Sequence, residues 1–296
     1  MMKRQTLRPS LVFQDYVTYY ELRELVVLET RGVRPLPARH AQLLIFHLAD
    51  TVGSDLLYRN TGEIVATPPA GIQGPQTFRV TDALWKGRFR DFVVSFTPTG
   101  FHRLFGIPMS HLTDQVVEAS LLLGPGVRQL HDRLESATGF EEMVRVTENF
   151  LRGWLPRARP FHPVQAAASQ VLARHGGITI DDLARQVELS GRQLERKFVE
   201  EVGIPPKLYC RISRLNHALL LKEAKPLRTW TDLTYLAGYF DQNHMVKDFK
   251  ALAGTTPSEF FWLIENGFKP GRTLVGHSIH VGFLLGSLDF ACQNLG

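Results

Sequence analysis

The sequence predicts a two-domain α+β protein, with a β-rich first half and an all-helical second half. Three observations predict this organisation. The chain has 296 residues, which suits two domains with a core in each. Short apolar or alternating runs between turn residues dominate residues 11–96, whereas helical periodicity dominates residues 164–265. Between the halves, the proline-rich segment "LPRARPFHP", residues 155–163, predicts a linker.

The first domain, residues 1–154, is predicted to be a sheet sandwich or small barrel closed by two helices. Runs such as "AQLLIFHLAD", "GEIVATPP" and "FRDFVVSFTPTG" have strand length and are rich in β-branched and aromatic residues. After "TPTG" the apolar spacing becomes helical. Two amphipathic helices are then expected, and their apolar faces could form either core or a dimer contact. The faces hold Val127, Leu130 and Leu134, followed by Phe140, Val144, Thr147, Leu151 and Trp154.

Composition predicts a soluble protein of a reducing cytoplasm. Hydrophobic residues make up 44% and charged residues 21%, and no stretch approaches the roughly 18 unbroken apolar residues that span a membrane. The basic N-terminus lacks the apolar core of a secretory signal. Cys210 and Cys292 provide neither a disulfide framework nor zinc-ligand spacing. The net charge of +5 is too mild to argue for nucleic acid, so the placement of the charges must decide.

The stretch "TIDDLARQVELSGRQLERKFVEEVG", residues 179–203, predicts a helix-turn-helix. Thr179 and Ser190 are suited to cap two helices separated by a short break. In the second helix, Leu194 and Phe198 lie one turn apart and form a core stripe. A helix, a tight break and a capped second helix are the parts of this motif.

Polar and charged residues occupy the opposite face of this second helix. Arg192 and Arg196 can each donate two hydrogen bonds to guanine, and Glu195 can accept one from cytosine. Lys197 and Arg185 flank this face and are suited to phosphate contacts. The alternative is an ordinary solvated helix face, which a single such motif leaves open.

A second copy of the layout follows in "TWTDLTYLAGYFDQNHMVKDFKALAG", residues 229–254. Asp232 is expected to begin its first helix and Asp241 to cap its second, whose core stripe is Met245 and Phe249. A helical spacer, "KLYCRISRLNHALLLKEAKPL", joins the copies. Two such helices would enter successive major grooves about 34 Å apart. Their combined DNA-binding candidates are Arg192, Gln193, Glu195, Arg196, Lys197, Gln242, Asn243, His244, Lys247 and Lys250.

Residues 164–266 resemble the DNA-binding domain of the AraC/XylS family of bacterial transcription regulators. The family pattern is met in both copies and in the spacer by Ala184, Ser190, Leu194, Arg196, Phe198, Gly203, Pro206, Tyr209, Arg214, Leu215, Ala218, Gly238, Tyr239, Asp241, Gln242, His244, Phe249, Gly254, Thr256 and Pro257. Three positions carry a less usual residue: Thr234 replaces the usual Ala, Met245 a common aromatic residue, and Tyr239, although compatible with the pattern, the more usual Phe.

The first half resembles the N-terminal domain of uncharacterised function found in a subset of this family. The likeness lies in "FVVSFTPTGFHRLFGIPMSHLTDQVVE" and "LLGPGVRQLHDRL". Together the resemblances imply a transcription regulator of double-stranded promoter DNA, with RNA polymerase as a possible partner. They also imply a cupin-like sensor and dimerisation domain that binds a small-molecule effector, with the homodimer as the expected assembly. Residues 267–296 are an unassigned tail.

Two other function classes stay open beside the regulator. One is a ligand- or partner-binding protein in which DNA binding is secondary. The other, a metal-dependent cupin-type enzyme, needs clustered ligands, whereas His40, His47, His102 and His111 are scattered. In the tail, His277, His280 and Cys292 form only part of a ligand set, and neither cysteine lies in the motif of an alkyl-acceptor repair protein. No enzyme activity and no cofactor are therefore expected.

Overall fold

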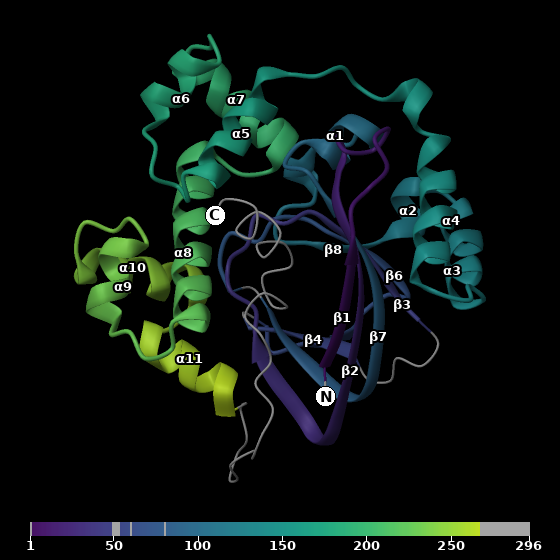
Figure 1. Cartoon of the computed structure of the whole chain (residues 1–296), viewed down its shortest axis with the longest axis horizontal. Helices are drawn as coiled ribbons and strands as arrows, with labels where there is room; N and C mark the ends of the chain where they lie inside the picture. The colour runs from purple at the N-terminus through teal and green to yellow at the C-terminus, as the bar shows by residue number, and fades with distance from the viewer. Residues whose placement is uncertain (1, 49–53, 60, 80, 267–296) are drawn as a thin grey trace.

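The computed structural model describes residues 2–48, 54–59, 61–79 and 81–266, and it consists of a curved antiparallel sheet followed by a helical half (Figure 1). This arrangement confirms the predicted α+β fold class. The limits predicted for the two domains and the linker stay a prediction. His277, His280, Cys292 and the rest of the tail lie outside the described residues.

The sheet is built around two long neighbouring strands, β2 (Val17–Pro35) and β7 (Thr81–Phe96). Its hydrogen-bonded order is β1-β2-β7-β3-β6-β8, while β4 pairs with β7 and β5. The remaining strands are β1 (Met2–Leu7), β3 (Leu43–His47), β4 (Ser54–Tyr58), β5 (Ile64–Ala66), β6 (Ala70–Gln73) and β8 (Val116–Glu118). A register shift interrupts the β2–β7 pairing between Val27 and Gly32.

Helices cover one face of the sheet, and two of them are the predicted amphipathic pair. These are α3 (Gly126–Glu135) and α4 (Phe140–Arg152), and the other elements are α1 (Gly100–Phe105), η1 (Met109–His111), α2 (Ala119–Leu123) and η2 (Leu155–Arg157). Their apolar residues, among them Leu130 and Leu151, belong to one core cluster with Phe46 and Phe92 of the sheet. The apolar faces of α3 and α4 therefore form core, which removes them as a dimer contact.

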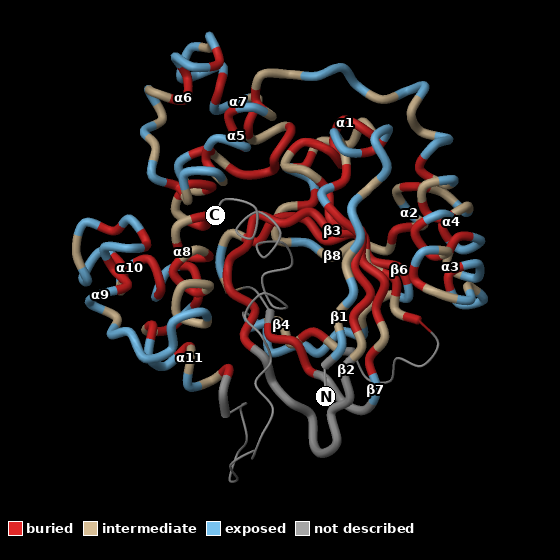
Figure 2. The backbone as a smooth tube through the Cα atoms, viewed as in Figure 1, coloured by how far each residue is buried: buried red, intermediate tan, exposed pale blue. Residues whose placement is uncertain are grey.

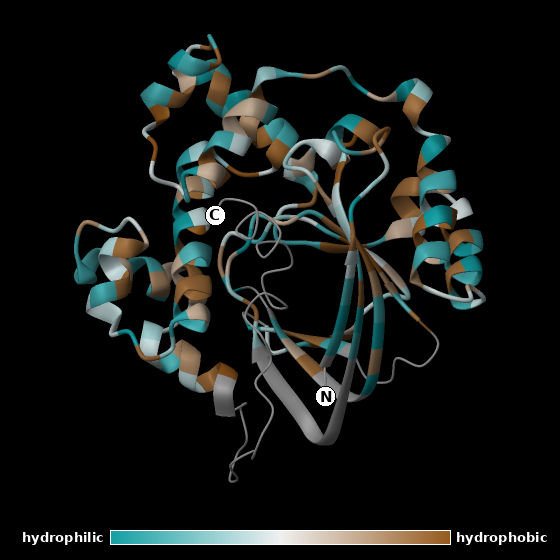
Figure 3. Cartoon of the chain, viewed as in Figure 1, coloured by the Kyte–Doolittle hydropathy of each residue, from teal (hydrophilic) through white to brown (hydrophobic). Residues whose placement is uncertain are grey.

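The second half contains the two predicted helix-turn-helix units on either side of a long helix. The first consists of α5 (Pro163–Ala173), α6 (Ile180–Gln186) and α7 (Gly191–Val202), and the second of α9 (Trp230–Leu236), α10 (Gln242–Ala253) and α11 (Pro257–Asn266). Between them runs α8 (Pro206–Ala224), which contacts both units. Buried and exposed residues alternate along these helices (Figure 2), as do hydrophobic and hydrophilic ones (Figure 3).

The helix caps follow the sequence with one correction. The side chains of Thr179, Ser190 and Asp241 accept hydrogen bonds from backbone N–H groups at the starts of α6, α7 and α10, as predicted. The prediction for α9 was wrong, because Thr229 and not Asp232 caps this helix. Asp232 lies three residues further on and accepts a hydrogen bond from the Thr229 backbone N–H. The two residues therefore form a reciprocal capping box.

The two halves share a single hydrophobic cluster. Leu36, Ala38 and Phe89 of the first domain belong to the same buried cluster as Phe198 and Tyr209 of the helical half. The backbone also crosses this boundary, because the Ala38 N–H donates to the Leu252 carbonyl over 2.8 Å. The two helix-turn-helix units, called the reader units from here on, are thus packed directly on the first domain.

Candidate nucleic-acid interface

Helix α7 presents one buried face and one exposed face. Leu194 and Phe198 are fully buried, whereas Arg192, Glu195 and Arg196 are exposed. Residues around the helix start line a pocket on the surface: Ser190, Arg192, Gln193, Glu195 and Arg196. Because the helix is fixed from behind by its apolar stripe, its two arginines project from a rigid element.

Two of the predicted residues on α7 already have intramolecular partners. The Gln193 side-chain oxygen accepts from the Ser190 backbone N–H at 3.0 Å and from the Ser190 hydroxyl at 2.9 Å. Lys197 Nζ donates to Glu200 Oε2 at 3.0 Å. Within the described part of the chain, Arg192, Glu195 and Arg196 form no ion pair or side-chain hydrogen bond. These three are therefore available to a ligand without breaking an internal contact.

Helix α10 repeats the arrangement in the second unit. Met245 and Phe249 are fully buried, and Asn243, Lys247 and Lys250 are exposed. Two further candidates also lie at the exposed start of the helix. The ring of His244 packs edge-on against Tyr239 with 5.4 Å between centroids, and the Gln242 side-chain oxygen accepts from the Thr231 hydroxyl at 3.2 Å.

A buried ion pair that the sequence analysis did not identify attaches α10 to α8. Arg211 on α8 donates through Nε to Asp248 Oδ1 at 2.9 Å, and the Asp248 side chain is 4% exposed. A carboxylate on the inner side of a recognition helix was the available signal, since buried charges require a partner. Arg185, predicted as a phosphate contact, is exposed on α6 and pairs with Asp182.

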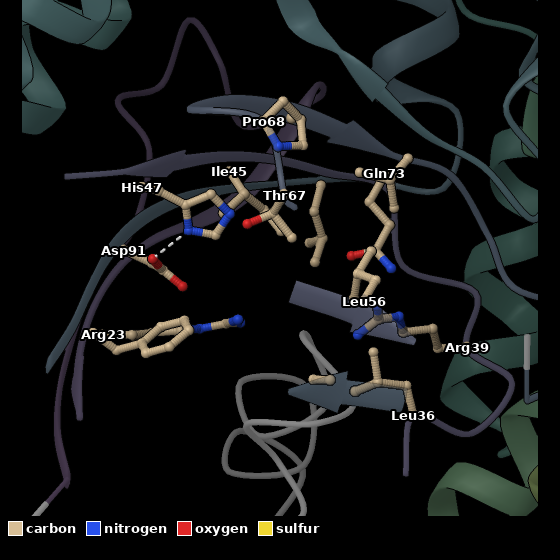
Figure 4. Close-up of a pocket in the computed structure, with 15 residues that line it drawn as sticks. Arg23, Leu36, Arg39, Ile45, His47, Leu56, Thr67, Pro68, Gln73 and Asp91 are labelled. Carbon is tan, nitrogen blue, oxygen red and sulfur yellow. Dashed lines mark hydrogen bonds and ion pairs between the residues drawn. The ribbon is translucent and has the colours of Figure 1, made fainter. Parts of the chain in front are cut away.

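The sheet holds a second candidate site, a cavity of about 80 Å³ lined by apolar and charged side chains (Figure 4). The guanidinium groups of Arg23 and Arg39 point toward its middle from opposite sides. His47 Nδ1 lies 2.7 Å from Asp91 Oδ1. The apolar lining consists of Leu36, Leu43, Ile45, Leu56, Pro68, Ala83, Phe89 and Val116.

The pKa values of two groups in this cavity, His47 and Arg39, are shifted in opposite directions. Burial lowers the pKa of His47, but the carboxylate of Asp91 and its hydrogen bond outweigh this effect, so that the pKa is raised. Burial and the nearby charge of Arg23 lower the pKa of Arg39. Arg23 is in turn paired with Glu21, whose Oε2 lies 2.7 Å from Nη2. The cavity therefore combines several cationic groups with an apolar wall.

The histidines considered as metal ligands do not converge. His40 is buried and faces the ring of Tyr209, with centroids 5.0 Å apart, and His102 contacts the Ile107 carbonyl at 2.9 Å. Among the described residues there is no group of three or more His, Cys, Asp or Glu side chains arranged to hold a metal ion. Cys210 is buried, which raises the pKa of its thiol to about 11. Such a thiol is a poor nucleophile.

Sequence comparisons agree with the two-part architecture. Residues 183–261 match the family described as "Helix-turn-helix domain", and residues 5–118 match "Domain of unknown function (DUF6597)". No curated protein matches the chain. In the part of the chain that the structure describes, no helix has the length and apolar character to cross a bilayer.

Structural comparisons find crystal structures of ToxT from Vibrio cholerae. The structure from strain O395 has a TM-score of 0.45 and 10% identity, over 88% of this chain and 97% of ToxT. A structure of unsaturated fatty acid-bound wild-type ToxT from strain SCE256 has a TM-score of 0.43 and 11% identity, over 81% and 93% of the two chains.

Two helix-turn-helix units joined by α8 define the class of this protein, a DNA-binding regulator of transcription. More narrowly, the chain carries an AraC-type helix-turn-helix domain, preceded by a DUF6597 domain.

Proposed function

We propose that the chain regulates transcription by placing α7 and α10 in successive major grooves on one face of promoter DNA. The observation that carries this proposal is the repeated geometry of the two helices. Each has a fully buried pair, Leu194 with Phe198 or Met245 with Phe249, behind an exposed polar face. Because α8 contacts both units, their separation is held by a helix and not by a flexible segment.

The exposed residues of the two helices have different roles in this proposal. Arg192 and Arg196 read guanine, and Glu195 accepts a hydrogen bond from a cytosine amino group. Asn243 reads adenine through two hydrogen bonds, and the side-chain amide of Gln242 can form the same pair. Contacts to phosphates come from Lys197, Lys247 and Lys250, with Gln193 and His244 beside them at the helix starts. Lys197 and Gln193 must first exchange their intramolecular partners for DNA.

Selection of bound sequences from a random DNA pool tests this proposal. Two conserved half-sites about one helical turn apart are the expected result. A variant pool with the two half-sites moved apart by half a turn provides the control, because it places them on opposite faces. Equal binding to both spacings, or enrichment of one half-site alone, would contradict the two-groove arrangement.

The cavity of the first domain supports control by a small-molecule effector. Its cationic groups, Arg23 and Arg39, together with its apolar wall suit a ligand that joins an anionic group to an apolar body. Binding of such a ligand would shift how the two readers are presented to DNA, since the first domain packs against them.

Paired ligands test this effector class without altering buried residues. The thermal unfolding temperature is measured with apolar carboxylic acids and with their uncharged amides at equal concentration. Stabilisation by an acid and not by its amide is expected. Equal stabilisation by both members of each pair would show that the cationic groups do not select the ligand.

Assembly and partners are a separate part of the proposal. We include a homodimer and contact with RNA polymerase, with action in the cytoplasm and no catalytic activity. The buried apolar faces of α3 and α4 leave a dimer to form through another surface. Light scattering after size-exclusion chromatography tests this, and a strict monomer at micromolar concentration would rule out the dimer. A protein that binds an effector but selects no DNA sequence would instead be a binding protein with a secondary DNA affinity.

A further inference from the structure

The C-terminal end of α7 is seated on the first domain. The Thr113 hydroxyl donates to the Gly203 carbonyl at 2.6 Å, and Gln42 Nε2 donates to the Val202 carbonyl at 3.4 Å. Gly203 has a φ of +98°, and a Cβ built on it would lie 2.8 Å from Pro75 Cγ. The last turn of α7 is therefore held by close contact with the first domain. We call this contact the seam, and a change inside it would alter the position of the helix.

A buried carboxyl group lies in this seam. Glu201, in the last turn of α7, is 4% exposed, and its Oε1 is 3.3 Å from His162 Nδ1. Among the described residues its Oε2 has no hydrogen-bond partner. A buried carboxylate with an unsatisfied oxygen is costly, whereas a carboxylic acid in the same place is much less so.

The contact with His162 locates the proton. His162 Nδ1 is the N-cap acceptor of α5, because it accepts the Val164 backbone N–H at 3.3 Å. A ring nitrogen that accepts a hydrogen bond carries no hydrogen of its own. With its Nδ1 lone pair facing Val164, the neutral ring offers Glu201 no hydrogen. An ionised Glu201 would therefore place lone pairs against each other across the 3.3 Å contact, and a proton on Glu201 removes this repulsion.

We propose that Glu201 is a neutral carboxylic acid when α7 is seated, and that loss of this proton weakens the seating of the first reader unit. This makes the contact between the reader and the first domain dependent on pH. Only its consequence for DNA binding rests on the proposed function; the seating itself does not.

The charged groups around Glu201 have other partners. On α7, Lys197 is paired with Glu200. From α1, Arg103 Nη1 donates to the Gln165 side-chain oxygen at 2.6 Å, and His102 contacts the Ile107 carbonyl. From the linker, Arg159 Nη2 donates to the Gly106 carbonyl at 3.0 Å, and its Nη1 lies 3.9 Å from Glu200 Oε1. These surrounding cations are engaged elsewhere and do not form an ion pair with Glu201 within the described residues.

The pKa shifts of Glu201 and His162 agree with this arrangement. Burial, opposed in part by Lys197, raises the pKa of Glu201 to about 7. Burial and the charge of Lys197 lower the pKa of His162. Both pKa shifts favour the neutral forms of the two side chains.

The sign of the pH dependence follows from the raised pKa of Glu201. An exposed glutamate has a pKa of roughly 4.3, so the seated form binds its proton more tightly than the released form. Seating is therefore strongest below that value and weakens as the pH rises to about 7, above which it is constant. Between pH 6 and pH 8 the seating equilibrium should fall by about tenfold.

Hydrogen exchange of the full chain without DNA tests the proposal. Exchange at residues 198–204 and 109–113, corrected for the intrinsic effect of pH, should accelerate by up to about tenfold between pH 6 and 8. Glu201→Gln keeps a neutral side chain of the same shape without a titrating proton, so its corrected exchange should not depend on pH. Glu200→Gln, which removes the neighbouring carboxylate, should keep the wild-type dependence.

One further variant covers a failure of Glu201→Gln to fold. Glu201→Leu replaces the carboxyl by an apolar group of similar size, and it should also give pH-independent exchange. The proposal is overturned if the wild type and the folded Glu201 variants share one pH profile. Because the measurement contains no DNA, its outcome is separate from that of the sequence selection, whose failure would contradict the proposed function instead.

Discussion

Arg211 and Asp248 form a buried ion pair that joins the connecting helix to the second recognition helix, with Arg211 Nη2 2.8 Å from Asp248 Oδ1. The carboxylate is almost fully buried, while the guanidinium is partly exposed. The pair therefore helps to hold α10 in one orientation against α8, a property that two-site DNA recognition requires.

Removal of one partner of this pair should destabilise the chain. Arg211→Ala leaves the Asp248 carboxylate buried without its cation, and we expect a loss of about 1–3 kcal/mol in the free energy of unfolding. The double variant Arg211→Leu/Asp248→Leu should recover most of this loss, because it buries no charge. Urea unfolding followed by circular dichroism measures both, and a double variant as unstable as the single one would contradict the explanation.

A base-reading role for Arg196 predicts a loss of specificity. Arg196→Ala should cost about 1–3 kcal/mol of specific binding and relax the preference at one base pair. Arg185→Ala is the matched control, since Arg185 is an exposed arginine of the preceding helix. It should weaken binding evenly across DNA sequences. It should also reduce the slope of log affinity against log salt concentration by about one, because one phosphate contact is lost. Titration of DNA at several salt concentrations distinguishes them, and identical behaviour of the two variants would argue against base reading.

A pair of glycines separates backbone strain from contact between the domains. Gly203 and Gly238 both have positive φ, but a Cβ at Gly238 meets no atom within 4 Å, whereas one at Gly203 meets Pro75. Both alanine variants should lose about 1 kcal/mol of stability from the left-handed conformation. Only Gly203→Ala should also accelerate proteolysis of the linker at residues 155–163, because it forces α7 from the first domain. Equal rates in the two variants would show that the seam tolerates the methyl group.

The two histidines His47 and His40 should titrate far apart. The carboxylate of Asp91 raises the pKa of His47, while burial lowers that of His40 to about 4. The His47 pair therefore stabilises the chain at acidic pH, and this contribution is lost as the pH rises through the raised pKa. NMR titration of the imidazole resonances gives both values, with His47→Gln as the assignment control. A His47 that titrates below an exposed histidine would contradict the contact.

The reader units could be predicted closely because their signals are local in sequence. Ser190 caps α7 and Leu194 occupies its core stripe, as spacing alone predicted. The one local error, at Thr229 and Asp232, arose because both residues of a capping box favour a helix start. Thr229 precedes the first helical residue and therefore takes the cap.

The cavity and the seam could not be predicted, because they join residues far apart in the chain. Arg23 and Arg39 come from separate segments, and only the curvature of the sheet brings them to one space. Glu201 lies in the last turn of α7, whereas His162 is the N-cap residue of α5, and neither residue has an unusual sequence environment. Long-range pairing of this kind leaves no periodic pattern to detect.

The shared core that contains Leu36 and Tyr209 has a consequence for how the protein melts and how it can be dissected. A fragment cut at the linker would expose apolar side chains on both pieces and would leave the Leu252 carbonyl without the Ala38 N–H. The isolated reader should consequently be less soluble than the whole chain. Heat should unfold the first domain and the reader in one cooperative transition, so that any ligand which stabilises the sheet also stabilises the helices proposed to contact DNA.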